Sequence, residues 1–153
     1  MSMIYKGINI GLATSSIGVL AIVLLGITHV FELSDSSRKF IYKVFTYEIL
    51  ANFSDLLVTV LEGIAGKEIR IVMLLSANLT YVFCLLAEFS LLQYVMSAIE
   101  DEKFYKTFKR RMTLEFIFFH LLILVNAIWG CFFTISEQNM YVYAKGVLWL
   151  FSF

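Results

Sequence analysis

Three ionisable side chains lie well inside long apolar segments of this sequence and are candidates for chemistry: Asp55, Glu88 and His120. An ionisable group inside a bilayer costs at least about 2.5–3.5 kcal/mol on insertion scales, so each one needs a partner or a task. At about 1.5 Å of helix per residue, all three lie roughly 12–16 Å from the helix ends that we expect to be cytoplasmic. The sequence therefore predicts one polar layer in the inner half of a membrane.

This predicted layer has two interpretations. In the functional one, the cluster senses protons or a ligand, because a histidine such as His120 titrates near physiological pH. In the structural one, a satisfied polar cluster fixes helix packing, as hydrogen bonds between membrane helices commonly do. Both interpretations stay open, because equal depth does not show that the three side chains face one another.

Further polar residues form a second, outer set. Asn78 and Asn126 each lie about eight residues, or ~12 Å, from the outer end of their predicted helix. They predict an Asn–Asn bridge between two helices, worth about 0.6–2 kcal/mol. Glu62 follows Asp55 by seven residues, so it shares nearly the same helical face. We expect Glu62 either to line an outward-facing vestibule or to reach water.

The sequence contains no catalytic or cofactor-binding motif. It has no phosphate-cradling glycine-rich loop, no H-E-x-x-H and no CxxC. Cys84 and Cys131 lie in apolar stretches without a second Cys or His at ligand spacing. These features predict reduced, buried thiols in preference to a disulfide or a metal site. We therefore expect no enzymatic activity in this chain, no metal and no cofactor.

The composition predicts that membrane helices position these side chains. Apolar residues make up 60% of the 153 and charged residues 16%, and there is no proline. In typical soluble domains, apolar residues make up roughly 45–50% and charged residues about 25%. The net charge of zero argues against a nucleic-acid partner. About 20 apolar residues span the hydrocarbon core as a helix, and four segments reach this length: 8–31, 46–66, 71–99 and 112–135.

The predicted fold is thus an all-α integral membrane protein with a single membrane domain over residues 1–153. It consists of four transmembrane helices and the start of a fifth at residues 146–153. Those eight residues correspond to about 12 Å of helix, which is too short to span a bilayer alone. We interpret them as the first part of a helix that continues beyond Phe153.

Basic residues predict the orientation, because cytoplasmic connections carry an excess of Lys and Arg. One expected connection holds Arg38, Lys39 and Lys43, and another forms a basic loop with five cations: Lys103, Lys106, Lys109, Arg110 and Arg111. This distribution places both connections in the cytoplasm and the N-terminus outside. The second connection also suits anionic lipid headgroups, although a topology signal is the simpler interpretation.

Three stretches carry a resemblance to a known family: "SSRKFIYKVF" (36–45), "ANFSDLL" (51–57) and "FTISEQNMYVYAKGVLWLFSF" (133–153). They resemble the N-terminal membrane modules of bacterial, clostridial-type sensor proteins. Such modules are N-out bundles of seven helices, followed by a GGDEF diguanylate cyclase or a histidine kinase. Lys145, Gly146 and Val147 stand where the family pattern has Arg-Gly-Pro. The resemblance implies signal reception in a bacterial cell membrane and a truncated chain.

Three functional hypotheses follow. The first is a sensory module, a fragment of a larger receptor, whose partners are the bilayer, a second copy of the chain and a C-terminal output domain. The second is a small transporter or channel subunit in which Asp55, Glu88 and His120 line a pathway. The third is a non-catalytic membrane scaffold.

Overall fold

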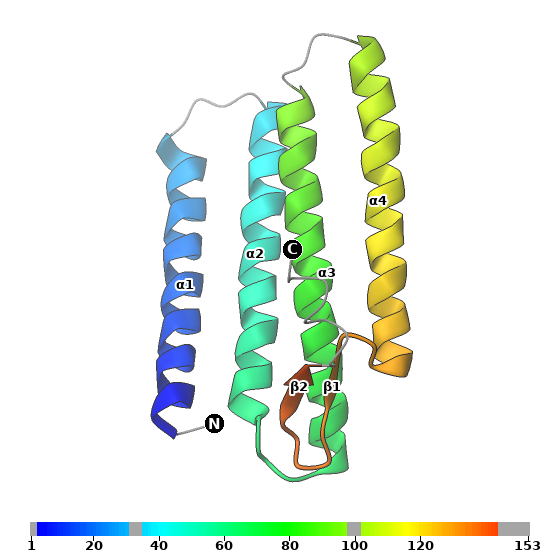
Figure 1. The fold of residues 1–153 in the computed structure, drawn as a ribbon. Helices are drawn as coiled ribbons and strands as arrows, with labels where there is room; N and C mark the ends of the chain where they lie inside the picture. The colour runs from blue at the N-terminus through cyan, green and yellow to red at the C-terminus, as the bar shows by residue number, and fades with distance from the viewer. Residues whose placement is uncertain (1–2, 31–34, 98–101, 144–153) are drawn as a thin grey trace.

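The computed structural model describes residues 3–30, 35–97 and 102–143. Within these ranges the chain forms four helices and one hairpin (Figure 1). The helices are α1 (Met3–Val30), α2 (Asp35–Leu61), α3 (Lys67–Ser97) and α4 (Glu102–Trp129). The hairpin pairs β1 (Phe133–Ile135) with β2 (Tyr141–Tyr143). The predicted fifth helix at 146–153 lies outside the described residues.

All four helices are long and apolar enough to cross a membrane, which confirms the helical class predicted from composition. Their outer faces carry large exposed apolar side chains, among them Leu12 and Ile22 on α1 and Leu124 and Ile128 on α4. A bilayer is the solvent in which such surfaces are stable, because lipid replaces the water that would otherwise meet them.

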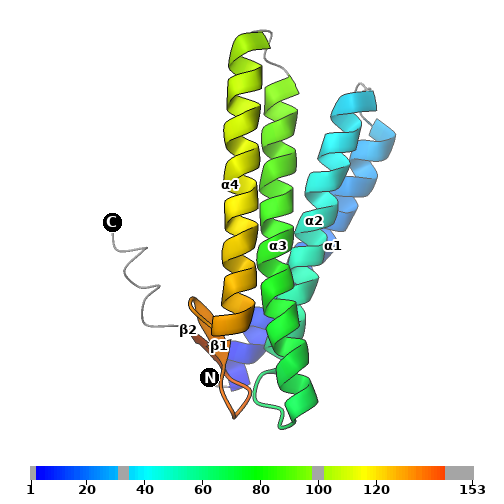
Figure 2. The ribbon, with the colours of Figure 1, turned by 90° about the vertical axis from the view of Figure 1, so that its right-hand side faces the viewer.

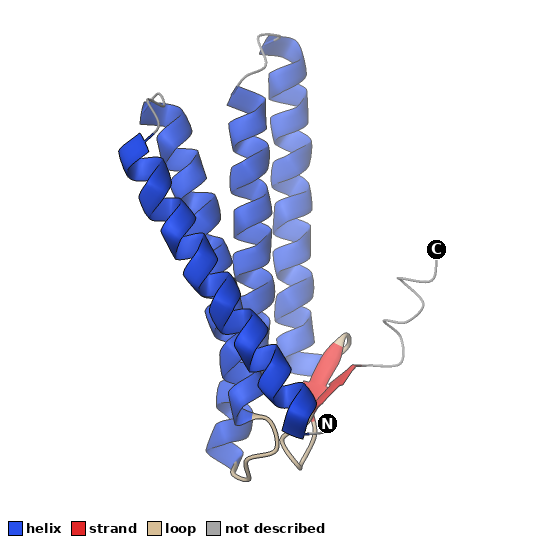
Figure 3. Cartoon of the chain, turned by 90° about the vertical axis from the view of Figure 1, so that its left-hand side faces the viewer, coloured by secondary structure: helices blue, strands red, loops and turns tan. Residues whose placement is uncertain are grey.

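The four helices are arranged as two pairs that share one central contact. α2 and α3 make the most extensive contact, while α1 packs on α2 and α4 packs on α3. Figures 2 and 3 show the α1–α2 pair diverging from the α3–α4 pair toward the end at which α2 and α4 begin. The elements approach most closely at the opposite end, where the hairpin and the start of α1 lie (Figure 1).

All four helices start earlier than predicted, α1 at Met3 and α3 at Lys67, and for two of them the difference is ten residues or more. α2 begins at Asp35 and not at residue 46, and α4 begins at Glu102 and not at residue 112. The residues of the two predicted basic connections from Arg38 and from Lys103 onward are therefore helical, and the basic loop does not exist as a loop. Lys and Arg are good helix formers, so a helix continues past its apolar segment into the headgroup region.

The turn between α2 and α3 also differs from the prediction. It occupies residues 62–66, whereas the predicted turn was 67–70. Gly63 has a φ of 80° and Gly66 a φ of 143°, conformations that L side chains rarely adopt and that end the helix. The residues from Lys67 to Arg70 instead form the first turn of α3, where Glu68 interacts favourably with the helix dipole.

The prediction that the fourth helix runs to Ile135 was wrong beyond Trp129. Gly130 has a φ of 63°, and its N–H still donates to the Asn126 carbonyl at 2.7 Å. The Asn126 side-chain oxygen then accepts from the N–H groups of Phe132 (2.7 Å) and Phe133 (3.1 Å). The N–H groups of Phe132 and Phe133 are therefore satisfied without the carbonyls of a continuing helix, and the chain turns back as a strand.

Asn139 fastens the hairpin to the turn between α2 and α3. It has a φ of 54°, a left-handed conformation that Asn tolerates better than most residues. Its side-chain Nδ2 donates to the carbonyls of Ile64 (2.6 Å) and Gly66 (2.9 Å). In return, the Gly63 N–H donates to the Asn139 carbonyl at 2.8 Å. Three hydrogen bonds from one residue thus join segments that are about 75 positions apart.

The buried apolar cluster lies at this same end of the molecule. It consists of Val58 from α2, Met73 and Ala77 from α3, and Phe133 and Ile135 from β1. Phe133 and Ile135 alternate with the exposed Thr134, so the hairpin presents one apolar face to the helices. The hairpin is therefore a packed part of the fold.

Replacing Asn139 tests this attachment. Asn139→Ala should lower the free energy of unfolding by about 1–3 kcal/mol, because the carbonyls of Ile64 and Gly66 both lose their donor. Asn139→Gly tolerates the positive φ, so its smaller loss measures the hydrogen bonds without the backbone strain. Thermal unfolding in detergent measures both, with the exposed Gln138→Ala as control. Equal stability of Asn139→Ala and Gln138→Ala would contradict the assignment.

Candidate functional site

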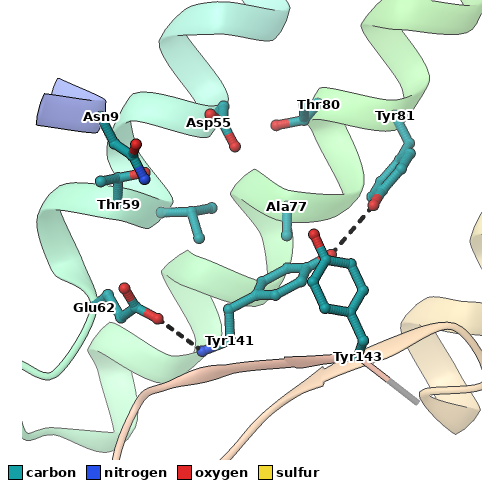
Figure 4. Close-up of a pocket in the computed structure, with 10 residues that line it drawn as sticks. Asn9, Asp55, Thr59, Glu62, Ala77, Thr80, Tyr81, Tyr141 and Tyr143 are labelled. Atoms are coloured by element: carbon teal, nitrogen blue, oxygen red, sulfur yellow. Dashed lines mark hydrogen bonds between the residues drawn. The ribbon is translucent and has the colours of Figure 1, made fainter. Parts of the chain in front are cut away.

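A cavity of about 360 Å³ lies between α2, α3 and β2, with one residue from α1 at its edge (Figure 4). Its polar helical lining consists of Asn9 from α1, Asp55 and Thr59 from α2, Glu62 from the following turn, and Thr80 from α3. Val58 and Ala77 supply apolar surface between these groups. The hairpin contributes Tyr141 and Tyr143, so a ligand in the cavity contacts both the helices and the hairpin.

The two carboxylates of the cavity lie two helical turns apart. Asp55 and Glu62 are seven residues apart, which puts them on one face at a spacing of about 10.5 Å along the axis. Glu62 accepts a hydrogen bond from the Tyr141 N–H at 3.3 Å. In the part of the chain that the structure describes, neither carboxylate forms an ion pair, and Asp55 accepts no hydrogen bond. Figure 4 shows Asp55 and Thr80 facing each other across the gap between α2 and α3.

Aromatic rings form the wall on the hairpin side. Phe133 stacks with Tyr81 (centroids 5.4 Å apart) and with Tyr141 (5.0 Å). The hydroxyls of Tyr81 and Tyr141 share a hydrogen bond of 3.2 Å. Tyr143 meets Tyr141 nearly at right angles, with centroids 5.0 Å apart and an interplanar angle of 74°. Two ring planes thus meet at a corner beside the cavity.

Lys6 links α1 to the end of α2 close to this cavity. Its ammonium donates to the carbonyls of Val60 (3.0 Å) and Glu62 (2.8 Å). The last carbonyls of a helix lack an intrahelical donor, and a cation at this end also suits the helix dipole. Lys6 therefore caps α2 without lining the cavity.

A second, more open cavity of about 380 Å³ lies between α1 and α2. It shares Asn9 and Asp55 with the first, and Ser16 and Asn52 extend its polar lining. Asp55 thus stands where two polar hollows meet. The groove between α1 and α2 leads from Asp55 along α1 toward Ser16.

The predicted layer of Asp55, Glu88 and His120 is not one cluster in the structure. Asp55 lies level with Thr80, and Glu88 follows Thr80 by eight residues, or about 12 Å along α3. Glu88 lines a different hollow, between α3 and α4, together with Glu115 and Phe116. The depths were misjudged because α2 starts eleven residues earlier than predicted, which moves Asp55 toward the hairpin end.

His120 forms its contacts within its own helix. Its ring lies against Phe116 with centroids 4.0 Å apart, and its Nδ1 is 2.8 Å from the Phe116 carbonyl. Because a carbonyl only accepts, Nδ1 carries the proton in this arrangement. Among the described residues, His120 has no hydrogen bond or ion pair with Asp55 or Glu88.

The predicted bridge between Asn78 and Asn126 does not form. Asn78 Nδ2 donates to the Leu74 carbonyl at 2.7 Å, while Asn126 Oδ1 accepts from the backbone that follows α4. Asn78 Oδ1 and Asn126 Nδ2 are buried without a partner. Both side chains bind backbone because helix and hairpin supply nearer partners than the facing helix does.

The residues of the two predicted basic connections lie at the starts of α2 and α4, at the end opposite the hairpin (Figure 1). Lys109 stands over the Tyr105 ring, 5.6 Å from its centroid, and both line a hollow of about 300 Å³ between α2, α3 and α4. Arg110 and Arg111 are exposed, as is Lys106. The side chain of Lys103 lies outside the described residues.

Several cavity residues escaped the sequence analysis. Thr59 follows Asp55 by four positions, and Thr80 and Tyr81 follow Ala77 by three and four, so helical spacing relates each set. The hairpin had a signal as well. Two short runs rich in β-branched and aromatic residues, 132–135 and 141–143, flank a polar turn.

Comparison with protein-family models, with curated proteins and with solved structures finds no significant match to this chain. Within the described ranges, no group of three or more His, Cys, Asp and Glu side chains is arranged to hold a metal ion. The geometry of the cavity is therefore the basis for any assignment of function.

Alkaline pH tests the environment of Tyr141. Burial, followed by the hydrogen bond with Tyr81, raises the pKa of the Tyr141 phenol well above its ordinary value of 10.0. The folded state thus holds this proton more tightly than the unfolded state, and stability falls as the pH rises above about 10. The melting temperature of Tyr141→Phe should drop less than that of the wild type between about pH 9 and pH 11. An identical drop would contradict the burial of this hydroxyl.

Proposed function

We propose that this chain is the ligand-binding membrane module of a sensory receptor. A small ligand occupies the cavity between α2, α3 and β2, and the hairpin transmits its presence to the residues that follow. The observation that carries this proposal is the double role of β2. Tyr141 and Tyr143 line the cavity, and the chain leads from this strand directly into the segment predicted to be a fifth membrane helix.

The contacts of the hairpin suit a role in transmission. A ligand changes a conformational equilibrium only to the extent that it binds one state better than the other. Here a ligand that contacts Asp55 and Tyr143 at the same time favours the docked position of β2. Displacements of about 1–2 Å in a helix are sufficient to switch an output domain in known systems.

We also propose an orientation for this module in a bacterial cell membrane. The cavity, the hairpin and the N-terminus face outside, while the basic ends of α2 and α4 face the cytoplasm. Support comes from the distribution of Lys and Arg and from the position of the basic stretch at the end away from the hairpin. A ligand from outside the cell then has direct access to the cavity.

The transport hypothesis has less support than the sensory one. A pathway through Asp55, Glu88 and His120 needs these groups to line one continuous space. Asp55 and Glu88 instead line separate cavities, one bordered by α2, α3 and the hairpin and the other by α3 and α4. The scaffold hypothesis does not account for a cavity lined by two carboxylates.

The two native cysteines offer a test of the orientation. Cys131 is exposed and follows α4 at the hairpin end, whereas Cys84 lies within α3. A membrane-impermeant maleimide should label Cys131 in intact cells, and Cys131→Ser should abolish labelling. With Cys131→Ser as background, Arg110→Cys should be labelled only after the cells are opened. Labelling of Arg110→Cys in intact cells would reverse the orientation.

A cavity-filling variant tests ligand binding. A set of small metabolites of mixed charge is screened for compounds that raise the melting temperature of the purified chain in lipid nanodiscs. Thr80→Phe should abolish the response to any compound that binds in the cavity, because the larger side chain fills it. Thr113→Phe, on the exposed face of α4, is the matched control. A response that both variants retain would exclude the cavity, and a set without any active compound would contradict the sensory proposal.

A further inference from the structure

The geometry points to one class of ligand for this cavity: a small α,ω-diamine, an aliphatic chain of four or five carbons with a primary ammonium group at each end. The inference rests on the proposed function, because it takes the cavity to be a ligand site. It specifies what that site recognises.

The charges of the cavity favour a cation. Asp55 and Glu62 both line it, and none of its described lining residues is basic. Lys6 lies at this end of α2, but its ammonium binds the backbone carbonyls of Val60 and Glu62. Two carboxylates that line one partly enclosed cavity with no basic residue in its lining disfavour each other's charge and are less well solvated than in open water. A dicationic ligand removes both penalties at once.

The hydroxyl groups around the cavity also favour a ligand that donates hydrogen bonds. Thr80 uses its hydroxyl proton on the Ser76 carbonyl at 3.1 Å, so only its oxygen lone pairs remain for a ligand. One of the Tyr81 and Tyr141 hydroxyls donates its proton to the other in a 3.2 Å hydrogen bond, so the donating hydroxyl has only its oxygen lone pairs left for a ligand. A primary ammonium has three N–H donors and no acceptor, which complements a carboxylate beside a threonine oxygen. A quaternary ammonium has no such donors.

The spacing of the lining residues along α2 favours two charges over one. Asp55, Val58 and Glu62 fall on one helical face in the order carboxylate, apolar, carboxylate, and Ala77 of α3 also lines the apolar middle. The carboxylates stand about 10.5 Å apart along the axis. An extended diamine of four or five carbons places its nitrogens roughly 6–7.5 Å apart by standard bond geometry. Hydrogen bonds of about 2.8 Å at each end then cover the remaining distance.

The aromatic corner and the size of the cavity agree with this ligand. An ammonium group is attracted to the faces of tyrosine rings, and Tyr141 and Tyr143 present two ring planes at 74° beside Glu62. The volume of about 360 Å³ is near the lower limit of roughly 300 Å³ for small-molecule sites. A single divalent metal ion fits less well, because carboxylates two turns apart do not both reach oxygen–metal distances of about 2.3–2.6 Å.

Calorimetric titration of the full chain in lipid nanodiscs tests the inference with three probes of matched length. We expect 1,4-diaminobutane to bind saturably, n-butylamine to bind at least about 10-fold more weakly, and neutral 1,4-butanediol not to bind. Asp55→Asn and Glu62→Gln should each weaken the binding of 1,4-diaminobutane by about 10–100-fold, the factor for loss of one hydrogen bond to a charged group. Glu88→Gln removes the same charge outside the cavity and should leave the affinity unchanged.

Both variants are expected to fold, because Asp55 has no partner to lose and Gln at position 62 keeps an acceptor for the Tyr141 N–H. Thr80→Phe, which leaves both carboxylates in place, should also abolish binding and provides an independent check. Equal affinity for butylamine and diaminobutane would overturn the requirement for two charges. Binding that Asp55→Asn, Glu62→Gln and Glu88→Gln weaken equally would overturn the site. If diaminobutane does not bind while another metabolite stabilises the chain in a way that Thr80→Phe abolishes, the ligand class is wrong and the sensory proposal stands.

Discussion

The attachment of the hairpin to the turn between α2 and α3 is the constraint on which the rest of the site depends. Asn139 supplies it through hydrogen bonds to Ile64, Gly66 and Gly63. Asn126 makes it possible by ending α4 and satisfying the first N–H groups of the hairpin segment. Without these two amides, β2 has no fixed position, and the cavity loses its tyrosine wall. The side-chain hydrogen bonds that join distant segments are thus concentrated at the hairpin end of the molecule.

Along the rest of the helices, polar side chains bind their own backbone. Asn52, Asn78, Ser90 and His120 each bond the carbonyl four residues earlier. In an apolar solvent this is a ready way to satisfy a polar group, since the carbonyl is always within reach. These side chains therefore contribute no hydrogen bond between helices, and within the described residues the helices meet there largely through apolar side chains. The two helix pairs diverge away from the hairpin (Figures 2 and 3), which agrees with a helix–helix contact that few hydrogen bonds fix there.

The cavity lies between the hydrogen-bonded hairpin end and the apolar part of the helices. Asp55 belongs to the helical part and has no hydrogen-bond partner among the described residues, whereas Glu62 already accepts from the backbone N–H of Tyr141. A ligand that binds both carboxylates therefore links α2 to the hairpin through the aromatic corner. In the sensory proposal this link is the step that converts binding into a change at β2. In the same proposal, the segment after β2 is the route by which such a change would reach an output domain.

The sequence by itself determined the helical class and the presence of four helices long and apolar enough to cross a membrane, because composition and the length of apolar segments depend only on local residues. It also showed that Asp55 and Glu62 share a helical face, since periodicity is a local property. It misplaced the start of α2, because Lys and Arg near a bilayer suit a helix as well as a loop, and the depth of Asp55 relative to Glu88 was therefore wrong. Only the tertiary structure decided that Asn126 and Asn139 hold a hairpin and that Tyr141 and Tyr143 complete a cavity. Those contacts join residues far apart in the chain, and which distant partner a polar side chain meets is set by the packing of the whole fold.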